Sequence, residues 1–282
     1  MKYRKYCVLN VVAQPHPDGI YRELFSTASS NAAANYRADH FARVSPVTGS
    51  KDGIFRGRLA LWTELDPNEP TIHKDSFDQK LLSDSDISLP RDIGFNSKIF
   101  YFSFNEKSHR LYIELRNDEG GTISPGVARL ALDAILKSAE IFQGVSVNVY
   151  IATTSAAVEK VLRTPIIRRI DIRLDLPNDD DLSDSEKKVL EKIKKRKIKR
   201  YEQSMTKLAS AETLVLLPRD EDLAHLSKDN GYTKVWGKDV KGNKVEISTR
   251  DFPDIRTMEL DDEGSSYRKL GSLAREDNER EI

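Results

Sequence analysis

Positively charged side chains are concentrated in one short stretch of this sequence. Residues 188–200, KVLEKIKKRKIKR, contain eight Lys and Arg against one acid, Glu191. Ammonium and guanidinium groups at this density are typical of surfaces that bind nucleic-acid phosphates. We therefore predict that this stretch binds double-stranded DNA through its phosphates, without sequence preference. The predicted contact residues are Lys192, Lys194, Lys195, Arg196, Lys197, Lys199 and Arg200, with Arg168 and Arg169 as further candidates.

The same charges allow other interpretations. Residues 175–186, DLPNDDDLSDSE, carry six acids just before the basic stretch, so the stretch would then be a solvated helix face that is balanced within the chain. Alternatively, a basic helix would dock on an acidic protein surface, as an interaction or inhibitor module. Arg169 shares a strand face with Asp171, so charge pairing within a sheet is the alternative for this arginine.

Residues that could perform catalysis are sparse. The five histidines are scattered and form no H-E-x-x-H pattern, and no Gly-rich phosphate loop occurs. A metal-dependent nuclease or toxin remains a third hypothesis, with Asp175, Asp179 and Asp181 as ligands. Consecutive carboxylates such as those at 179–181 point in different directions, however, and no D…E-x-K motif accompanies them. We predict no cofactor or metal and name no catalytic residue.

Composition describes a polar globular protein. The 282 residues include 38% hydrophobic and 32% charged residues, and 45 basic side chains balance 45 acidic ones. Apolar runs such as Ile99–Phe102 are far shorter than the ~20 residues of a membrane span, so we predict no membrane insertion. One cysteine, Cys7, excludes an internal disulfide, and the N-terminus has no secretory apolar region. A cytoplasmic location is the simplest expectation.

Alternating and helical hydrophobic patterns predict the elements that would position these residues. Their mixture, with at least two antiparallel hairpins, predicts an α+β fold with mixed, largely antiparallel sheets and two lobes. Strands are predicted at 6–13, 54–65, 145–153 and 166–176, hairpins at 98–117 and 231–250, and helices at 20–43, 125–142 and 153–164. Ser124 and Pro125 are the expected start of the second of these helices, at 125–142, and Gly144 is its expected end.

A long helix is predicted for the basic stretch itself. Ser183 to Glu186 has the pattern of a capping box, and Ile198, Tyr201, Met205 and Leu208 recur at spacings of 3, 4 and 3. The chain is expected to divide into an N-terminal domain at 1–143, a C-terminal domain at 144–260 and a flexible acidic tail at 261–282.

Four segments in one order resemble RexA-type phage-exclusion proteins and the related KwaB-type bacterial defence proteins. These segments are IGFNSKIFYF, LYIELRN, VSVNVYIATTSAAVEKVL and PIIRRIDIRLDLPNDDD, and the likeness spans residues 55–177. The resemblance implies a bacterial or prophage antiviral protein that binds DNA with little sequence preference, as a homodimer and with a protein partner encoded nearby. It carries no catalytic residues over to this chain.

Overall fold

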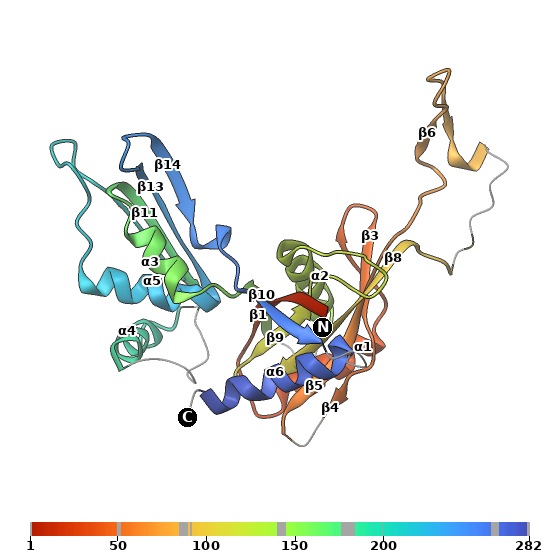
Figure 1. Cartoon of the computed structure of the whole chain (residues 1–282), viewed down its shortest axis with the longest axis horizontal. Helices are drawn as coiled ribbons and strands as arrows, with labels where there is room; N and C mark the ends of the chain where they lie inside the picture. The colour runs from red at the N-terminus through yellow and green to blue at the C-terminus, as the bar shows by residue number, and fades with distance from the viewer. Residues whose placement is uncertain are drawn as a thin grey trace.

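The chain folds into two lobes and a projecting arm, as Figure 1 shows. This computed structural model describes residues 2–49, 52–84, 90, 92–139, 145–175, 184–198, 200–260 and 265–280. Of these described residues, those within 2–63, 92–151 and 255–280 form the large lobe, and those within 155–251 form the small lobe. The arm comprises residues 64–84. Among the described residues, no helix has the length and apolar character needed to cross a membrane.

One antiparallel sheet forms the large lobe. The long strand β1 (Lys2–Gln14) pairs with β9 on one side, and with β10 and β15 in succession on the other. The order is β10-β1-β9-β8-β5-β3-β2, with β15 beside β1 and β4 beside β5. The other strands are β2 (Ala34–Arg37), β3 (His40–Val44), β4 (Thr48–Gly49), β5 (Ile54–Thr63), β8 (Phe95–Asn105), β9 (Arg110–Glu114), β10 (Ser146–Ile151) and β15 (Ile255–Leu260).

Helices cover both faces of this sheet. On one face, α1 (Ile20–Ser30) and α2 (Pro125–Lys137) pack over a core that includes Phe25, Phe102 and Leu132. Helix α2 begins where expected, because the Ser124 side chain accepts a hydrogen bond from the Val127 amide at 3.2 Å. On the other face, α6 (Ser266–Arg280) packs through Leu270 and Ala274.

The small lobe has one helical layer on a four-stranded antiparallel sheet. The order is β12-β11-β13-β14, and the helices share a hydrophobic core with one sheet face. Polar side chains such as Arg169 and Glu202 occupy the other face. The elements are α3 (Ser155–Leu162), β11 (Ile166–Asp175), α4 (Asp184–Lys194), β12 (Arg200–Thr206), α5 (Pro218–Asn230), β13 (Gly231–Lys238), β14 (Lys244–Ser248) and η2 (Thr249–Asp251).

The prediction of a long basic helix is wrong for the second half of that helix. Helix α4 ends at Lys194, residues 195–197 form a turn, and Lys197 has a left-handed φ of 54°. The strand β12 follows, with Tyr201 and Met205 half-buried against the helices. A separation of four residues places two side chains on one face of a helix and also on one face of a strand, so this spacing did not distinguish them.

The predicted domain boundaries also differ from the fold. Strands β10 and β15 lie on either side of the small lobe in the chain, yet both pair with β1 in the large sheet. The small lobe is therefore inserted between two strands of the large lobe, and the chain does not divide at residue 143. The expected flexible tail is wrong over 266–280, where α6 packs on the large sheet with Leu270 fully buried.

Other predictions have mixed outcomes. The mixed α+β fold class, the hairpins and the strands at 54–63 and 146–151 are confirmed, and Val147 and Val149 face the core as expected. The helix predicted over 20–43 ends at Ser30, and the β2–β3 hairpin follows it. Helix α2 ends at Lys137, five residues earlier than predicted. The helix end expected at Gly144 and the capping serine at 183 lie outside the described residues.

Candidate nucleic-acid interface

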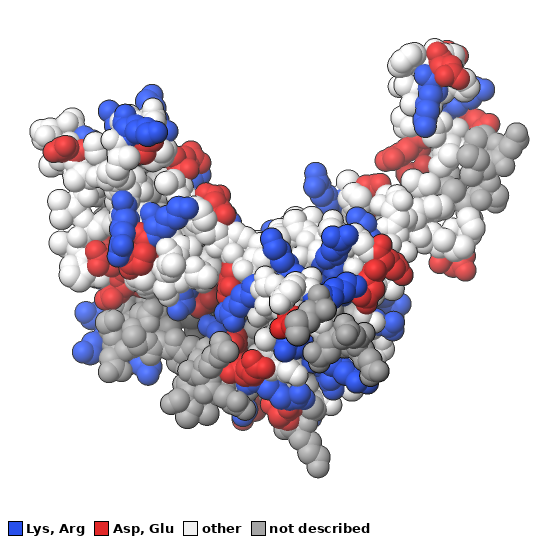
Figure 2. Space-filling model, viewed as in Figure 1, with Lys and Arg blue, Asp and Glu red and all other residues white. Residues whose placement is uncertain are grey.

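The predicted basic residues are divided between two places. Lys192 on α4 and Lys195, Arg196 and Lys197 in the turn after it are exposed to solvent. Lys194 is the last residue of α4, and Lys199 lies outside the described residues. In Figure 2, basic side chains are visible around the lower part of the small lobe, where α4 lies. The exposed residues of this group therefore form a basic surface on α4 and the turn that follows it.

The predicted arginines on the sheet are mostly paired with acids. Arg169 binds Asp171 with two hydrogen bonds of 2.8 Å, and its guanidinium lies 4.9 Å from the centre of the Trp236 ring. Arg200 binds Asp175 across the β11–β12 pair at 2.6 Å. Pairing within the sheet, the alternative interpretation, is therefore observed for Arg169 and holds for Arg200 as well. Arg168 is exposed.

A cavity of about 390 Å³ lies where the two lobes meet, and basic side chains outnumber acidic ones in its lining. Arg173 and Arg200 come from adjacent strands of the small sheet, and Arg250 comes from η2. Arg129 and Lys137 come from α2 in the large lobe. We refer to Arg129, Arg173 and Arg250 as the arginine cluster. The tertiary fold brings these three side chains together from positions far apart in the chain.

The arginine cluster is incompletely neutralised. Within the described part of the chain, Arg129 and Arg250 have no carboxylate within 4 Å, and Arg173 has only Glu202 at 3.5 Å. The Arg250 guanidinium stacks on the Tyr232 ring, 4.0 Å from its centre. Burial, together with the like charges of Arg173 and Arg129, lowers the pKa of Arg250. A bound anion would relieve this repulsion.

The acids in the cavity wall are already engaged. Asp175 accepts hydrogen bonds from Arg200 and from the Tyr150 hydroxyl. Burial and this contact with Asp175 raise the pKa of Tyr150, so the phenol stays protonated and donates. Asp133 accepts from the Val149 amide at 3.0 Å and pairs with Lys137 at 2.7 Å. These carboxylates position the walls and leave the arginine cluster unbalanced.

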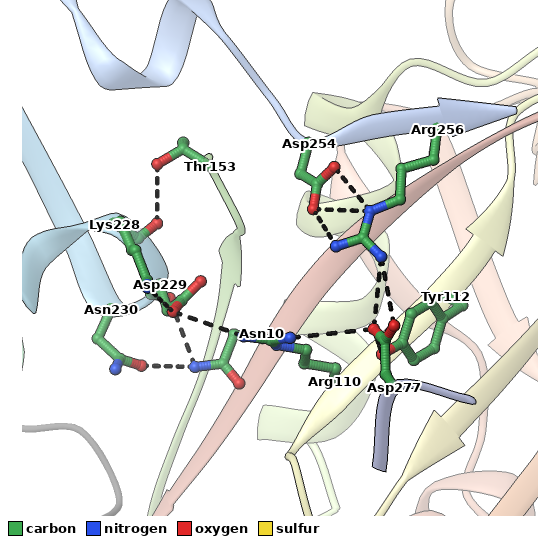
Figure 3. A network of polar contacts seen from close by, with 10 residues as sticks. All are labelled: Asn10, Arg110, Tyr112, Thr153, Lys228, Asp229, Asn230, Asp254, Arg256 and Asp277. Atoms are coloured by element: carbon green, nitrogen blue, oxygen red, sulfur yellow. Dashed lines mark hydrogen bonds and ion pairs between the residues drawn. The ribbon is translucent and has the colours of Figure 1, made fainter. Parts of the chain in front are cut away.

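A network of polar contacts, drawn in Figure 3, holds the lobes together beside this cavity. Asn10 on β1 donates to the Asn230 side chain at 2.7 Å, and Thr153 donates to the Lys228 carbonyl at 3.1 Å. The first contact fastens the end of α5, in the small lobe, to β1 of the large lobe, and the second fastens it to the segment that joins β10 to α3. Asn10, Thr153 and Asn230 are buried, so leaving any of them unpaired would be costly. The contacts therefore position the two walls of the cavity relative to each other.

The same network extends to the C-terminal helix. Arg256 on β15 binds Asp254 at 2.8 Å and Asp277 of α6 at 3.4 Å. Its hydrogen bonds to Asp254 are the main cause of the raised pKa of Arg256. Tyr112 also donates to Asp277. The far end of α6 is thereby tied to the strands that carry the contacts between the lobes.

Sequence reasoning missed most of the cavity. Of the predicted phosphate contacts that the structure describes, only Arg200 lines it, while Arg129, Arg173 and Arg250 were not among the predicted contacts. Arg173 follows Arg169 at strand spacing on β11, whereas Arg129 and Arg250 carry no local signal. Each is a single arginine in an unremarkable element, and only packing of the lobes shows that they converge.

The metal hypothesis finds no support in the described residues. Among them, no three His, Cys, Asp or Glu side chains are grouped so that they could hold a metal ion. Asp175 is occupied by Arg200 and Tyr150, and Asp179 and Asp181 lie outside the described residues.

The chain belongs to a protein family that is recognised by sequence similarity. The model of the family DUF4747, described as a domain of unknown function, matches residues 2–275, almost the whole chain. The match spans both lobes and the arm. No curated protein matches the sequence. The resemblance to RexA-type and KwaB-type defence proteins stays a prediction.

Proposed function

We propose that this protein binds nucleic acid through its phosphates, and that the arginine cluster is the main anchor. The observation that carries the proposal is the convergence of Arg129, Arg173 and Arg250 on one open cavity, with two of them lacking a carboxylate partner in the described structure. Guanidinium groups suit this role because they donate two parallel hydrogen bonds to phosphate oxygens.

The proposed ligand is double-stranded DNA, read without sequence preference. The charged groups that the cavity offers are those that bind phosphate oxygens, and phosphate contacts alone carry no sequence information. The zero net charge of the chain is compatible with this function, because the local field depends on how charges are distributed. A role in antiviral defence is part of the proposal and rests on the resemblance described above.

The test is a binding titration with a fluorescein-labelled 20-base-pair duplex, followed by anisotropy between 50 and 300 mM NaCl. The same single strand and an RNA of that sequence serve as competitors. The variant Arg129→Gln/Arg250→Gln removes two charges at similar side-chain length. We expect at least a tenfold loss of affinity for every duplex, and a salt slope that is shallower by about 1.8, because each phosphate contact contributes about 0.9.

Two control variants make the result specific to the cavity. Arg163→Gln/Arg219→Gln removes two exposed arginines of the small lobe outside the cavity, and should change affinity by less than twofold. Lys195→Gln/Arg196→Gln/Lys197→Gln tests the surface predicted from the sequence. Equal losses of duplex affinity in all three variants would show that binding depends on the overall charge and not on the arginine cluster. Absence of duplex binding at 50 mM NaCl would refute the function itself.

A further inference from the structure

The arm has no hydrophobic core of its own. It consists of β6 (Pro70–Ile72), β7 (Gln79–Leu81) and η1 (Leu82–Asp84), and none of residues 64–84 is buried. Figure 1 shows the arm extending away from the large lobe. An isolated two-stranded hairpin is at best marginally stable in water, so an arm of this kind gains most of its stability from a surface that covers it.

The arm also exposes a row of apolar side chains. Phe77, at its tip, is 75% exposed, and its φ of 60° lies in the left-handed region that bulky residues rarely adopt. Leu65, Ile72 and Leu81 are exposed along the same hairpin. The surrounding charge is acidic, since residues 65–84 contain five acids and two bases. A surface that is both apolar and basic would complement the arm.

The small lobe carries a surface with these properties. Between β12 and α5, Leu208 and Val215 are each 74% exposed and Leu217 is 62% exposed. Residues 187–219 contain eleven bases and three acids. On α4 and its turn, Lys187, Lys188, Lys192, Lys195, Arg196 and Lys197 are exposed. Leu216, between Val215 and Leu217, belongs to the same hydrophobic core as α4, and α5, which begins directly after Leu217, packs against α4, so Val215, Leu217 and the basic residues of α4 lie on the helical side of the lobe. Leu208 lies next to Lys207, whose amide bonds to Arg168 at the other end of β11, and is left out of this region. We call this region the docking surface.

The arm and the docking surface of one chain lie at opposite ends of the molecule (Figure 1). A contact between them therefore requires two chains. We propose that the arm of one copy docks on the docking surface of a second copy and that the second arm returns the contact, forming a reciprocal dimer. Charge complementarity favours this pairing over contact between two acidic arms. The proposal uses none of the arginine cluster and does not depend on nucleic-acid binding.

The proposal also accounts for the basic run. The lysines and arginines at 192–197 would meet an acidic protein surface, as one interpretation of the sequence allowed. Pairing a charged rim with apolar anchors is a common arrangement of interfaces, in which a few large side chains contribute most of the affinity. Phe77 is the anchor that the arm offers.

Sedimentation velocity of the full chain without nucleic acid, from 1 to 100 µM, tests the proposal. We expect a dimer of twice 32.0 kDa at 50 mM NaCl, weakened at 500 mM NaCl. Phe77→Ser should weaken the dimer at least tenfold. Val240→Ser, at the exposed β13–β14 turn outside the docking surface, is the matched control and should have no effect.

Charge reversal identifies the two contacting surfaces. Asp75→Lys/Asp78→Lys reverses the arm, and Lys195→Glu/Arg196→Glu reverses the docking surface. Each variant alone should be monomeric at concentrations where the unmodified protein is a dimer. An equimolar mixture should dimerise again, because each arm then meets a surface of opposite charge. A monomeric unmodified protein, or a docking-surface variant that still dimerises, would overturn the proposal.

Discussion

Arg4 is a buried charge on which the large lobe depends, and replacing it gives a sharp test of how this lobe is held together. Its side chain is 2% exposed, and Glu114, its main partner, is fully buried. The guanidinium donates to Glu114 at 2.8 Å, to Asp118 at 2.5 Å and to the Ser266 hydroxyl at 2.6 Å. One side chain on β1 thus joins the neighbouring strand β9, the loop after it and the first residue of α6.

The variant Arg4→Met keeps the apolar stem of the side chain and removes its charge. Glu114 would keep one hydrogen bond, from the Tyr101 amide at 2.8 Å, and would lose its only described ion-pair partner. Breaking a buried ion pair on one side costs about 3–5 kcal/mol, against a total stability of about 5–15 kcal/mol. With a urea m-value of about 3 kcal/mol/M, the unfolding midpoint should fall by about 1 to 1.7 M.

Urea unfolding followed by tryptophan fluorescence and circular dichroism measures this shift. The two tryptophans report on different lobes, Trp62 on β5 and Trp236 on β13. Lys5→Met is the matched control, because Lys5 is the next residue on the same strand and is exposed. The double variant Arg4→Met/Glu114→Gln should recover part of the loss, since no unpaired charge remains. A midpoint for Arg4→Met within 0.3 M (about 1 kcal/mol) of the unmodified protein would refute the reasoning.

Two further predictions concern the core and the effect of pH. Val147 is 7% exposed on β10, so Val147→Asp should unfold the large lobe by placing an unpaired carboxylate in the core, at a cost of several kcal/mol. A soluble variant with normal thermal melting would show that the inward face is assigned wrongly. The hydrogen bond from Arg4 lowers the pKa of Asp118, so this contact stabilises the protein above the unfolded pKa of about 4 and is lost as pH falls through the lower folded pKa. Asp118→Asn should therefore lower Tm slightly at pH 6, and the difference should disappear towards pH 2.5, whereas a constant difference across that range would contradict this sign.

Local sequence patterns determined most of the elements, for identifiable reasons. Alternation over 54–63 and 146–151 identified strands because one face of each is buried, and Ser124 with Pro125 located the start of α2 because both residues suit a helix N-terminus. Such signals depend on neighbours in the chain. The concentration of Lys and Arg at 188–200 was equally visible, and the structure shows that Lys188, Lys192, Lys195, Arg196 and Lys197 are exposed.

Only the tertiary structure decided what these charges do. Tyr201 and Met205 satisfy both a helical and a strand pattern, and the choice was made by pairing with Leu174 and Ile170 on β11. Helix α6 has few apolar side chains, and its place on the sheet is set by contacts with residues more than 150 positions away, such as Tyr112. Arg129 and Arg250 approach each other because β15 returns to β1 and closes the small lobe against the large one. Side chains from distant positions meet only through packing, and no local period in the sequence records such meetings.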